Sequence, residues 1–247
     1  MVGIILNQPD RLSPMNKKVR ILVLNGSPNP ARNTATLMRW VVEGCKKEGA
    51  FVRWVDLHTS NINYCKGCHG CLRGDRCVIR DDVDRILEDL QTYDGAVVGS
   101  PVYEGSPSAQ MKTLMDRIAL FTLYRGILDD KRTVGVATSG VAPTKRTAKE
   151  CAMMFGRSSG LVMSKTATIS GGYREIDERT HRKLRKKAVR KGRKLVKDIR
   201  RPPFLSRSDL KYAWIGFLRR NFLKRMILKN PEEFAGVIEY WKDMGWL

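Results

Sequence analysis

The sequence has no long apolar run. Its longest apolar stretches, residues 19–24 (which Arg20 interrupts) and residues 96–98, fall far short of the roughly 18 residues that a membrane-spanning helix needs. At the N-terminus, Asn7 and Asp10 leave too few apolar residues in succession for the hydrophobic region of a secretory signal peptide. The sequence therefore predicts a protein that does not cross a bilayer and that stays in the cytoplasm.

Two common nucleotide-binding signatures are also absent. Neither the GxGxxG fingerprint of dinucleotide-binding domains nor the GxxxxGK[ST] pattern of P-loops occurs in the 247 residues. Internal repeats are missing as well. What the composition does provide is 42% hydrophobic and 29% charged residues, which is the range of globular domains and excludes a disordered, collagenous or low-complexity chain.

Acidic residues are scarce relative to basic ones. The chain has 25 Asp and Glu against 46 Lys and Arg, which gives a formal net charge of +21. Residues 174–230 contain 21 of the basic and 5 of the acidic residues, so +16 of the charge lies in this segment and +5 in the rest. The surplus is therefore a local property of the C-terminal part, where most basic residues of the helix predicted over 177–199 are expected on its solvated side.

Strand-like and helix-like patterns alternate along the chain. Apolar, β-branched runs predict strands over 19–24, 51–57, 95–100, 132–138 and 161–169, and apolar positions at helical spacing predict helices over 34–48, 82–91, 108–123, 144–159 and 177–199. Such alternation is typical of a parallel sheet with helices on both faces. We expect an α/β, flavodoxin-like, doubly wound sheet of five parallel strands in the order 2-1-3-4-5, whose ligand binds at the carboxyl ends of the strands.

The chain divides into three parts by composition. Residues 1–16 form a predicted N-terminal extension, and residues 17–200 form the flavodoxin-like domain with a cysteine-rich loop at 58–81. The sequence Arg201-Pro202-Pro203 ends the last helix of that domain. Residues 201–247 are then a predicted helical extension, with a basic amphipathic helix over 208–229 and a short helix over 232–243.

Three loops that follow strands have the residues of a binding site. Residues 26–34 combine a glycine with hydroxyl and amide side chains at the start of a helix, where backbone N–H groups attract anions, although an ordinary helix capped by Asn33 is an equally good reading of this loop alone. Residues 100–107 supply two prolines, a glycine and a tyrosine, and residues 138–141 are small enough for close backbone approach to a ligand. A flat ring that carries a phosphate fits this set of loops.

Four of the six cysteines lie within thirteen residues. Cys65, Cys68, Cys71 and Cys77 follow the spacing CxxCxxCx5C, and cytoplasmic thiols are rarely paired in disulfides. Such tight spacing favours an iron-sulfur cluster over zinc, for which two separated CxxC pairs are more usual, while unliganded or redox-active thiols remain an alternative. His69 completes a CxxCH string, but haem attachment does not suit a chain that is not exported. The isolated Cys45 and Cys151 are expected to act as small buried hydrophobic residues.

Three segments in this order resemble a known family. GSPNPARNT, CKGCHGCLRGDRCVIRDDVDRI and GSPVYEGSPSAQMKTLMDRI are similar to the iron-sulfur flavoproteins of the NAD(P)H-dependent FMN reductase superfamily, and the resemblance extends over about residues 19–199. It implies a chain that binds FMN and a [4Fe-4S] cluster. It also implies a homodimer or homotetramer in which the cluster and the flavin of neighbouring subunits lie close together.

The resemblance also implies a role for individual residues. The FMN phosphate would be held by Ser27, Arg32, Asn33 and Thr34, and the isoalloxazine ring would face Pro101, Val102, Tyr103, Glu104 and Gly105. The site would be closed by Thr138, Ser139 and Gly140, and the cluster would be bound by Cys65, Cys68, Cys71 and Cys77. Residues 141–143 depart from the family pattern, because Val-Ala-Pro stands in place of a glycine-rich stretch. No catalytic acid or base is assigned, and Tyr103 and Glu104 are candidates for orienting or tuning the flavin.

The leading functional hypothesis is an FMN-dependent oxidoreductase or electron-transfer flavoprotein in which a [4Fe-4S] cluster exchanges electrons with FMN, with NAD(P)H as a reductant. A cluster-free NAD(P)H-dependent FMN or quinone reductase is the alternative. A non-catalytic basic binding protein on a flavodoxin scaffold is the third hypothesis. The expected partners are a redox partner protein or a small-molecule electron acceptor. For the basic segment, a solvated face, an acidic redox partner and anionic lipid headgroups are candidates, and nucleic acid ranks last because no nucleic-acid-binding fold accompanies the charge.

Overall fold

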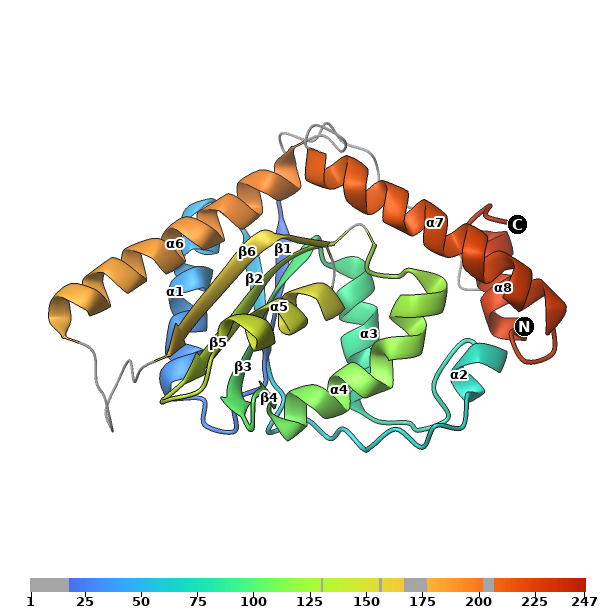
Figure 1. The fold of residues 1–247 in the computed structure, drawn as a ribbon, viewed down its shortest axis with the longest axis horizontal. Coiled ribbons are helices and arrows are strands. Elements are labelled where there is room, and N and C mark those ends of the chain that lie inside the picture. The colour runs from blue at the N-terminus through green and yellow to red at the C-terminus, as the bar shows by residue number, and fades with distance from the viewer. Residues whose placement is uncertain (1–17, 130, 156, 167–176, 202–206) are drawn as a thin grey trace.

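A computed structural model describes residues 18–129, 131–155, 157–166, 177–201 and 207–247. The predicted N-terminal extension at 1–16 and the last residues of the fifth predicted strand, 167–169, lie outside the described residues. Figure 1 shows a central sheet with helices packed on both of its faces and a pair of long helices, α6 and α7, that follow one another along the upper edge.

The sheet has the predicted topology. Five parallel strands lie in the order β2-β1-β3-β5-β6, which is the order 2-1-3-4-5 of the flavodoxin-like fold. Their bounds are β1 (Arg20–Asn25), β2 (Phe51–Asp56), β3 (Gly95–Tyr103), β5 (Arg132–Ser139) and β6 (Arg157–Thr166). The two-residue β4 (Ser106–Pro107) pairs antiparallel with the end of β3. The strand prediction is thus confirmed, with this short hairpin as an addition.

The two faces of the sheet are covered by different helices. On one face, α1 (Asn33–Lys47) and α6 (Glu178–Arg200) pack over alternate residues of β1, including Ile21 and Val23. On the other face, α3 (Asp82–Thr92), α4 (Ala109–Leu120) and α5 (Lys145–Met154) cover Leu22 and Leu24. Successive side chains of a strand point to opposite faces, so the continuous apolar run of β1 is explained by burial on both sides.

Two predicted helices end earlier than expected. The helix predicted over 108–123 ends at Leu120 and continues as a π-helical turn, η1 (Phe121–Arg125), before Gly126 adopts a φ of 64°. The helix predicted over 144–159 ends at Met154, because residues 157–159 belong to β6, where Ser158 pairs with Thr133 of β5. Pairing with the neighbouring strand outweighs the weak helix preference of the Arg-Ser-Ser-Gly segment.

The C-terminal helices are packed against the cysteine-rich loop. A short helix that the sequence did not predict, α2 (Gly70–Arg73), lies in that loop beside α8 (Ala235–Asp243), while α7 (Arg207–Lys229) leads into α8 (Figure 1). These elements share a separate apolar core, whose fully buried members are Leu72, Leu223, Ile227, Phe234, Val237 and Trp241. Helices α7 and α8 therefore support the cysteine-rich loop. None of the described helices is both long and apolar enough to span a membrane.

Candidate functional site

A cavity of about 310 Å³ lies at the carboxyl ends of β1, β3 and β5. The loops after these three strands are the ones that the sequence predicted to form the site. Ten of the twelve cofactor-binding residues suggested by the resemblance line this cavity, and Asn29 is an addition; the lining residues are Ser27, Asn29, Arg32, Asn33, Thr34, Pro101, Val102, Tyr103, Thr138, Ser139 and Gly140. The volume lies within the usual range of small-molecule sites.

The loop after β1 is shaped by polar contacts at the strand end. The amide Nδ2 of the buried Asn25 donates a hydrogen bond of 2.7 Å to Asp56 on β2, and its Oδ1 accepts one of 3.1 Å from the backbone N–H of Ser27. The Ser27 hydroxyl in turn donates to the carbonyl of Asn29 at 2.9 Å. These contacts turn the chain sharply away from the sheet and toward the start of α1.

Helix α1 begins at the cavity without a side-chain cap. Its N-cap residue is Arg32, which makes no capping hydrogen bond, and its first turn contains no acidic residue. The alternative reading, an ordinary helix capped by Asn33, is therefore wrong, because Asn33 is already the first residue of the helix. The start of the helix, where its dipole is positive, and the cationic residue Arg32 both line the cavity, which suits an anion.

The floor of the cavity joins α1 to β5. The hydroxyl oxygens of Thr34 and Thr138 are 2.7 Å apart, and both side chains are buried. In the following loop, the Ser139 hydroxyl accepts hydrogen bonds from the backbone N–H groups of Val141 and Ala142 at 3.2 and 2.8 Å. Ser139 therefore fixes the loop in which the chain departs from the family's glycine-rich pattern.

Two buried serines hold the wall opposite α1, and sequence reasoning did not single them out. The Ser108 hydroxyl caps α4 by accepting a hydrogen bond from the backbone N–H of Met111, and it donates one of 2.5 Å to the Gly26 carbonyl. The backbone N–H of Ser108 donates to the Ser100 hydroxyl at 2.8 Å. Both serines are fully buried. The SPxxxxSPS repetition of serine around the third strand end was the signal available in the sequence.

The remaining two predicted residues, Glu104 and Gly105, are not in the cavity lining. They form the tip of the β3–β4 hairpin, with φ values of 46° and 73°. Positive φ at both central residues is the conformation of tight two-residue hairpin turns. Tyr103, just before the tip, lines the cavity and is 54% exposed, so its ring is available to a ligand at the rim.

The four thiols of the cysteine-rich loop differ in exposure and are not gathered at one point. Cys65 and Cys68 are exposed, Cys71 and Cys77 are half-buried, and none is in a disulfide. Among the described residues, no three Cys, His, Asp or Glu side chains converge closely enough to hold a metal ion. Burial raises the pKa of the Cys71 thiol, Cys77 and Cys65 raise it further, and Arg125 opposes this shift.

Two buried arginines hold this loop from α4 and η1. Arg117 donates to the carboxylate of Asp81 and lies 3.5 Å from the Cys77 sulfur. Arg125 donates to the backbone carbonyls of Cys71 and Asp75 at 3.0 and 2.7 Å. Arg125 is 6% exposed, forms no ion pair with any carboxylate of the described chain, and its Nε has no hydrogen-bond partner. A buried cation without a counterion is costly, which suggests that the loop is built to hold negative charge.

The isolated cysteines have the role that the sequence predicted. Cys45 on α1 and Cys151 on α5 are fully buried, and burial raises the pKa of each thiol to about 12. They are packed in the two main cores on opposite faces of the sheet. Neither thiol belongs to a site.

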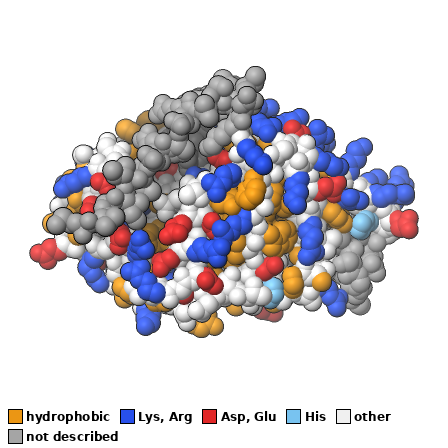
Figure 2. Space-filling model, turned by 180° about the vertical axis from the view of Figure 1, so that it is seen from behind, with side chains coloured by type: hydrophobic (Ala, Val, Ile, Leu, Met, Phe, Trp, Pro, Cys, Tyr) orange, Lys and Arg blue, Asp and Glu red, His pale blue; other side chains and the backbone are white. Residues whose placement is uncertain are grey.

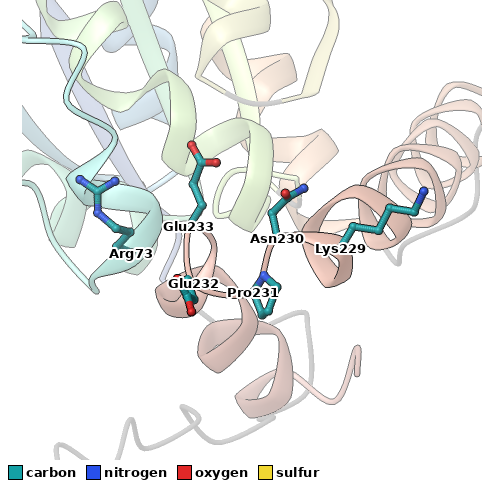
Figure 3. Close-up of a pocket in the computed structure, with 6 residues that line it drawn as sticks. All are labelled: Arg73, Lys229, Asn230, Pro231, Glu232 and Glu233. Carbon is teal, nitrogen blue, oxygen red and sulfur yellow. The ribbon is translucent and has the colours of Figure 1, made fainter.

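A second hollow, of about 560 Å³, lies between the cysteine loop and the turn from α7 to α8 (Figure 3). Figure 3 shows Glu233 between Arg73 on one side and Lys229 on the other. Glu233 also approaches His69 at 3.3 Å, and Arg73 donates to the Cys68 carbonyl at 2.9 Å. Because its two basic and two acidic side chains balance, the hollow has no marked preference for an ion, and we interpret it as part of the contact between the loop and the C-terminal helices.

Comparisons with known proteins agree with this picture. Residues 19–174 match the family of NADPH-dependent FMN reductases. An iron-sulfur flavoprotein of Clostridioides difficile is 26% identical over 230 residues, which cover 91% of this chain and 98% of the relative. Iron-sulfur flavoproteins of Methanocaldococcus jannaschii and Archaeoglobus fulgidus are 40% and 37% identical, over 40% and 50% of this chain. These two matches span 51% and 60% of the relatives' own lengths.

Solved structures show the same fold. An NAD(P)H:quinone oxidoreductase from Methanothermobacter marburgensis has a TM-score of 0.51 at 13% identity, over 72% of this chain and 98% of that one. An oxidoreductase from Corynebacterium diphtheriae has a TM-score of 0.51 at 16% identity, over 74% of this chain and 97% of that one. At such low identities the likeness establishes the α/β fold alone.

Proposed function

The chain belongs to the NADPH-dependent FMN reductase family, and on this basis we propose that it is an FMN-dependent oxidoreductase. The observation that carries the proposal is the cavity at the carboxyl ends of β1, β3 and β5, because the residues suggested for FMN meet there from three separate loops. This edge of a doubly wound sheet is where such folds bind their ligands.

The lining residues fit FMN in charge and in shape. Arg32 is the one charged residue among the described residues of the lining, and it stands at the uncapped start of α1, so this end suits the phosphate. Ser27, Asn33 and Thr34 would complete the phosphate contacts. At the other end, Pro101, Val102 and Tyr103 offer a rigid and largely apolar surface for the ring, with Thr138, Ser139 and Gly140 closing the site.

In this proposal the protein binds and orients the cofactor. FMN supplies the hydride- and electron-transfer chemistry. Among the described residues, the cavity lining contains no carboxylate, histidine or lysine, and the contribution of these lining residues is to position the cofactor. Ser108 and Ser100 fix the loop after β3 against the loop after β1, and the Thr34–Thr138 contact fixes α1 against β5. NAD(P)H is the proposed reductant.

We further propose that the cysteine loop binds a [4Fe-4S] cluster through Cys65, Cys68, Cys71 and Cys77. The assignment is supported by the names of the relatives, by the four thiols on one loop, and by the buried guanidinium of Arg125, which pairs with no carboxylate of the described residues. No residue of the loop lines the cavity, so exchange of electrons with FMN is best served by a homodimer or homotetramer that brings one copy's loop to another copy's cavity. A redox partner protein or a small molecule would then accept the electrons.

The second candidate is a cluster-free FMN or quinone reductase. It is favoured by the separation of the four thiols, since no three potential metal ligands converge among the described residues. The visible spectrum and iron content of protein purified without oxygen distinguish the two candidates. Flavin bands alone indicate the second, whereas additional broad absorption with about four iron atoms per chain indicates the first.

Substitution of one cluster ligand tests the assignment directly. Cys68→Ser should abolish the broad visible absorption and the bound iron while leaving the flavin bands, because Cys68 is exposed and its loss does not disturb the core. Cys151→Ala is the matched control, since it removes a buried thiol outside the loop and should keep the iron content of the wild type. Equal iron loss in both variants would contradict the assignment.

Charge reversal at the start of α1 tests the phosphate site. Arg32→Glu should weaken FMN binding about 10- to 100-fold, because it replaces an attractive charge by a repulsive one beside the phosphate. Riboflavin has no phosphate, so its binding should weaken by less than about threefold. Affinities are measured by quenching of flavin fluorescence on titration into the apoprotein.

The control for this experiment is Lys46→Glu, which makes the same charge change at the opposite end of α1. It should leave both affinities near those of the wild type. If Arg32→Glu weakened the binding of riboflavin as much as the binding of FMN, the phosphate would not be bound at the start of α1.

A further inference from the structure

One face of α7 exposes large apolar side chains to solvent. Trp214, Phe217, Leu218 and Phe222 are 60%, 49%, 48% and 79% exposed, and their spacing places them on one side of the helix. The rings of Trp214 and Phe217 are stacked with centroids 5.7 Å apart. We call these four residues the α7 stripe.

The α7 stripe is not the side by which the helix is held. On the opposite side, Leu223 and Ile227 are buried in the core that α7 shares with α8 and the cysteine loop. The Arg220 guanidinium also turns inward and lies 4.8 Å from the centre of the Trp246 ring. The helix is thus fixed by one face and presents the other outward. Contiguous apolar surface of this kind usually marks a contact site.

The chain segment that contains the α7 stripe is basic. Residues 210–230 contain six Lys or Arg and no Asp or Glu. Lys224, Arg225 and Lys229 are exposed and continue the outward side of the helix toward its C-terminus. An occupant of this surface therefore has to combine negative charge with an apolar layer that accepts aromatic side chains.

Helix α6 extends the positive charge along the same edge of the molecule (Figure 1). Two acidic neighbours, Glu43 on α1 and Glu48 just after its end, pair with basic residues of α6, namely Arg185, Arg193 and Lys197. Figure 2 shows basic side chains along the flank that α6 occupies. Several of its exposed cations form no ion pair with any described residue; these are Arg182, Lys183, Lys186, Lys187, Arg190 and Lys194.

Charge decides between the candidate occupants. A second copy of the chain, docked by the same surface, would bring the same cations face to face without acidic residues to offset them. Nucleic acid supplies the negative charge but no continuous apolar layer. A bilayer with anionic headgroups supplies both, since basic side chains bind its surface and aromatic side chains settle at the boundary with the acyl chains.

We propose that the α7 stripe and its flanking cations dock the protein on an anionic lipid bilayer. The stripe enters the interface while Lys224, Arg225 and Lys229 contact the headgroups, and α6 contributes attraction over a longer range. Because the contacts of these cations with the headgroups are electrostatic, salt weakens the attachment. It would place the flavin site at a membrane surface, where quinones and other apolar electron acceptors are concentrated.

Cosedimentation with vesicles tests the proposal on the full-length protein carrying FMN. The protein should bind vesicles of phosphatidylcholine mixed with phosphatidylserine, bind phosphatidylcholine alone at least tenfold more weakly, and dissociate at high salt. Trp214→Ser/Phe222→Ser should weaken binding at least tenfold. Lys224→Glu/Arg225→Glu should weaken it about fivefold or more for each cation removed. Retention of FMN shows that each variant is folded.

The matched control is Lys145→Glu/Lys149→Glu, which makes the same charge change on exposed positions of α5 and should keep most of the binding. Three results would overturn the proposal. The first is equal binding to both kinds of vesicle, and the second is unchanged binding of the stripe variant. The third is an absence of vesicle binding together with an oligomer, or a complex with single-stranded DNA, that the stripe variant disrupts.

Discussion

Replacement of Arg117 by leucine should lower the free energy of unfolding by about 3–5 kcal/mol, the usual cost of removing one partner of a buried ion pair. Arg117 and Asp81 are joined at 2.6 Å, and both side chains are fully inaccessible to solvent. Without the guanidinium, the Asp81 carboxylate would remain buried with no cation. The loss is measured by denaturant unfolding, and it should be accompanied by loosening of the cysteine loop.

The loop is affected because Arg117 joins its two ends. Besides Asp81, the guanidinium donates to the carbonyl of Asn63 at 2.7 Å, before the four cysteines, and to that of Ile79 at 3.2 Å, after them. One side chain of α4 therefore closes a segment that has little regular structure of its own. We expect faster proteolysis between residues 63 and 79 in the variant than in the wild type.

The difference between wild type and variant should depend on pH. Burial by itself opposes ionisation of Asp81, but hydrogen bonds from Arg117 and from the backbone of Asn63 and Val83 outweigh it and hold the pKa of Asp81 below its usual range. The ion pair thus contributes fully above the pKa of an unfolded aspartate, about 4, and the contribution is lost as the pH falls through the folded pKa. The stability gap should therefore narrow on acidification.

An exposed ion pair on the same helix provides the control. Lys112 and Asp116 are also 2.6 Å apart, but their side chains are 59% and 49% exposed. Lys112→Gln should therefore change stability by no more than about 1 kcal/mol. If Arg117→Leu cost no more than this control, the buried pair would not be what fixes the loop.

Gly192→Ala should destabilise the protein by about 1–3 kcal/mol or more, although alanine favours helices over glycine by about 1 kcal/mol. Helices α1 and α6 touch through glycines: a Cβ on Gly192 would lie 1.8 Å from the carbonyl oxygen of Val41, and one on Gly44 would lie 2.0 Å from that of Val189. The added methyl group therefore forces apart two helices that cover one face of the sheet. Thermal unfolding measures the effect.

The matched control is Gly216→Ala on α7. A Cβ at Gly216 would meet its nearest neighbours at 3.6 Å, which is ordinary contact, so this change should be neutral or stabilise by up to about 1 kcal/mol. Opposite signs for the two substitutions would show that the cost at Gly192 arises from the helix contact. Equal effects would show that the two helices can separate freely.

The sheet and its cavity could be predicted because the sequence patterns that indicate them are local. Strands buried on both faces read as continuous apolar runs, and parallel strands joined through helices can be ordered by the rules of doubly wound folds. The loops after β1, β3 and β5 then meet at one edge, which is why Ser27, Pro101 and Thr138 line a common cavity as expected. The misplaced end of the helix predicted over 144–159 reflects a long-range strand pairing that local preference does not reveal.

The sequence by itself determined the fold, the strand order, the place of the cavity and the clustering of four cysteines on one loop, since each depends on the type and spacing of residues close together in the chain. Only the tertiary structure decided what supports that loop. Three contacts provide this support: Arg117 pairs with Asp81, Arg125 on the π-helical turn binds the loop, and α7 and α8 pack against α2. Each of them joins residues that are 36 or more positions apart. Such contacts depend on how complete helices and strands pack against one another. The same packing leaves the α7 stripe exposed to solvent.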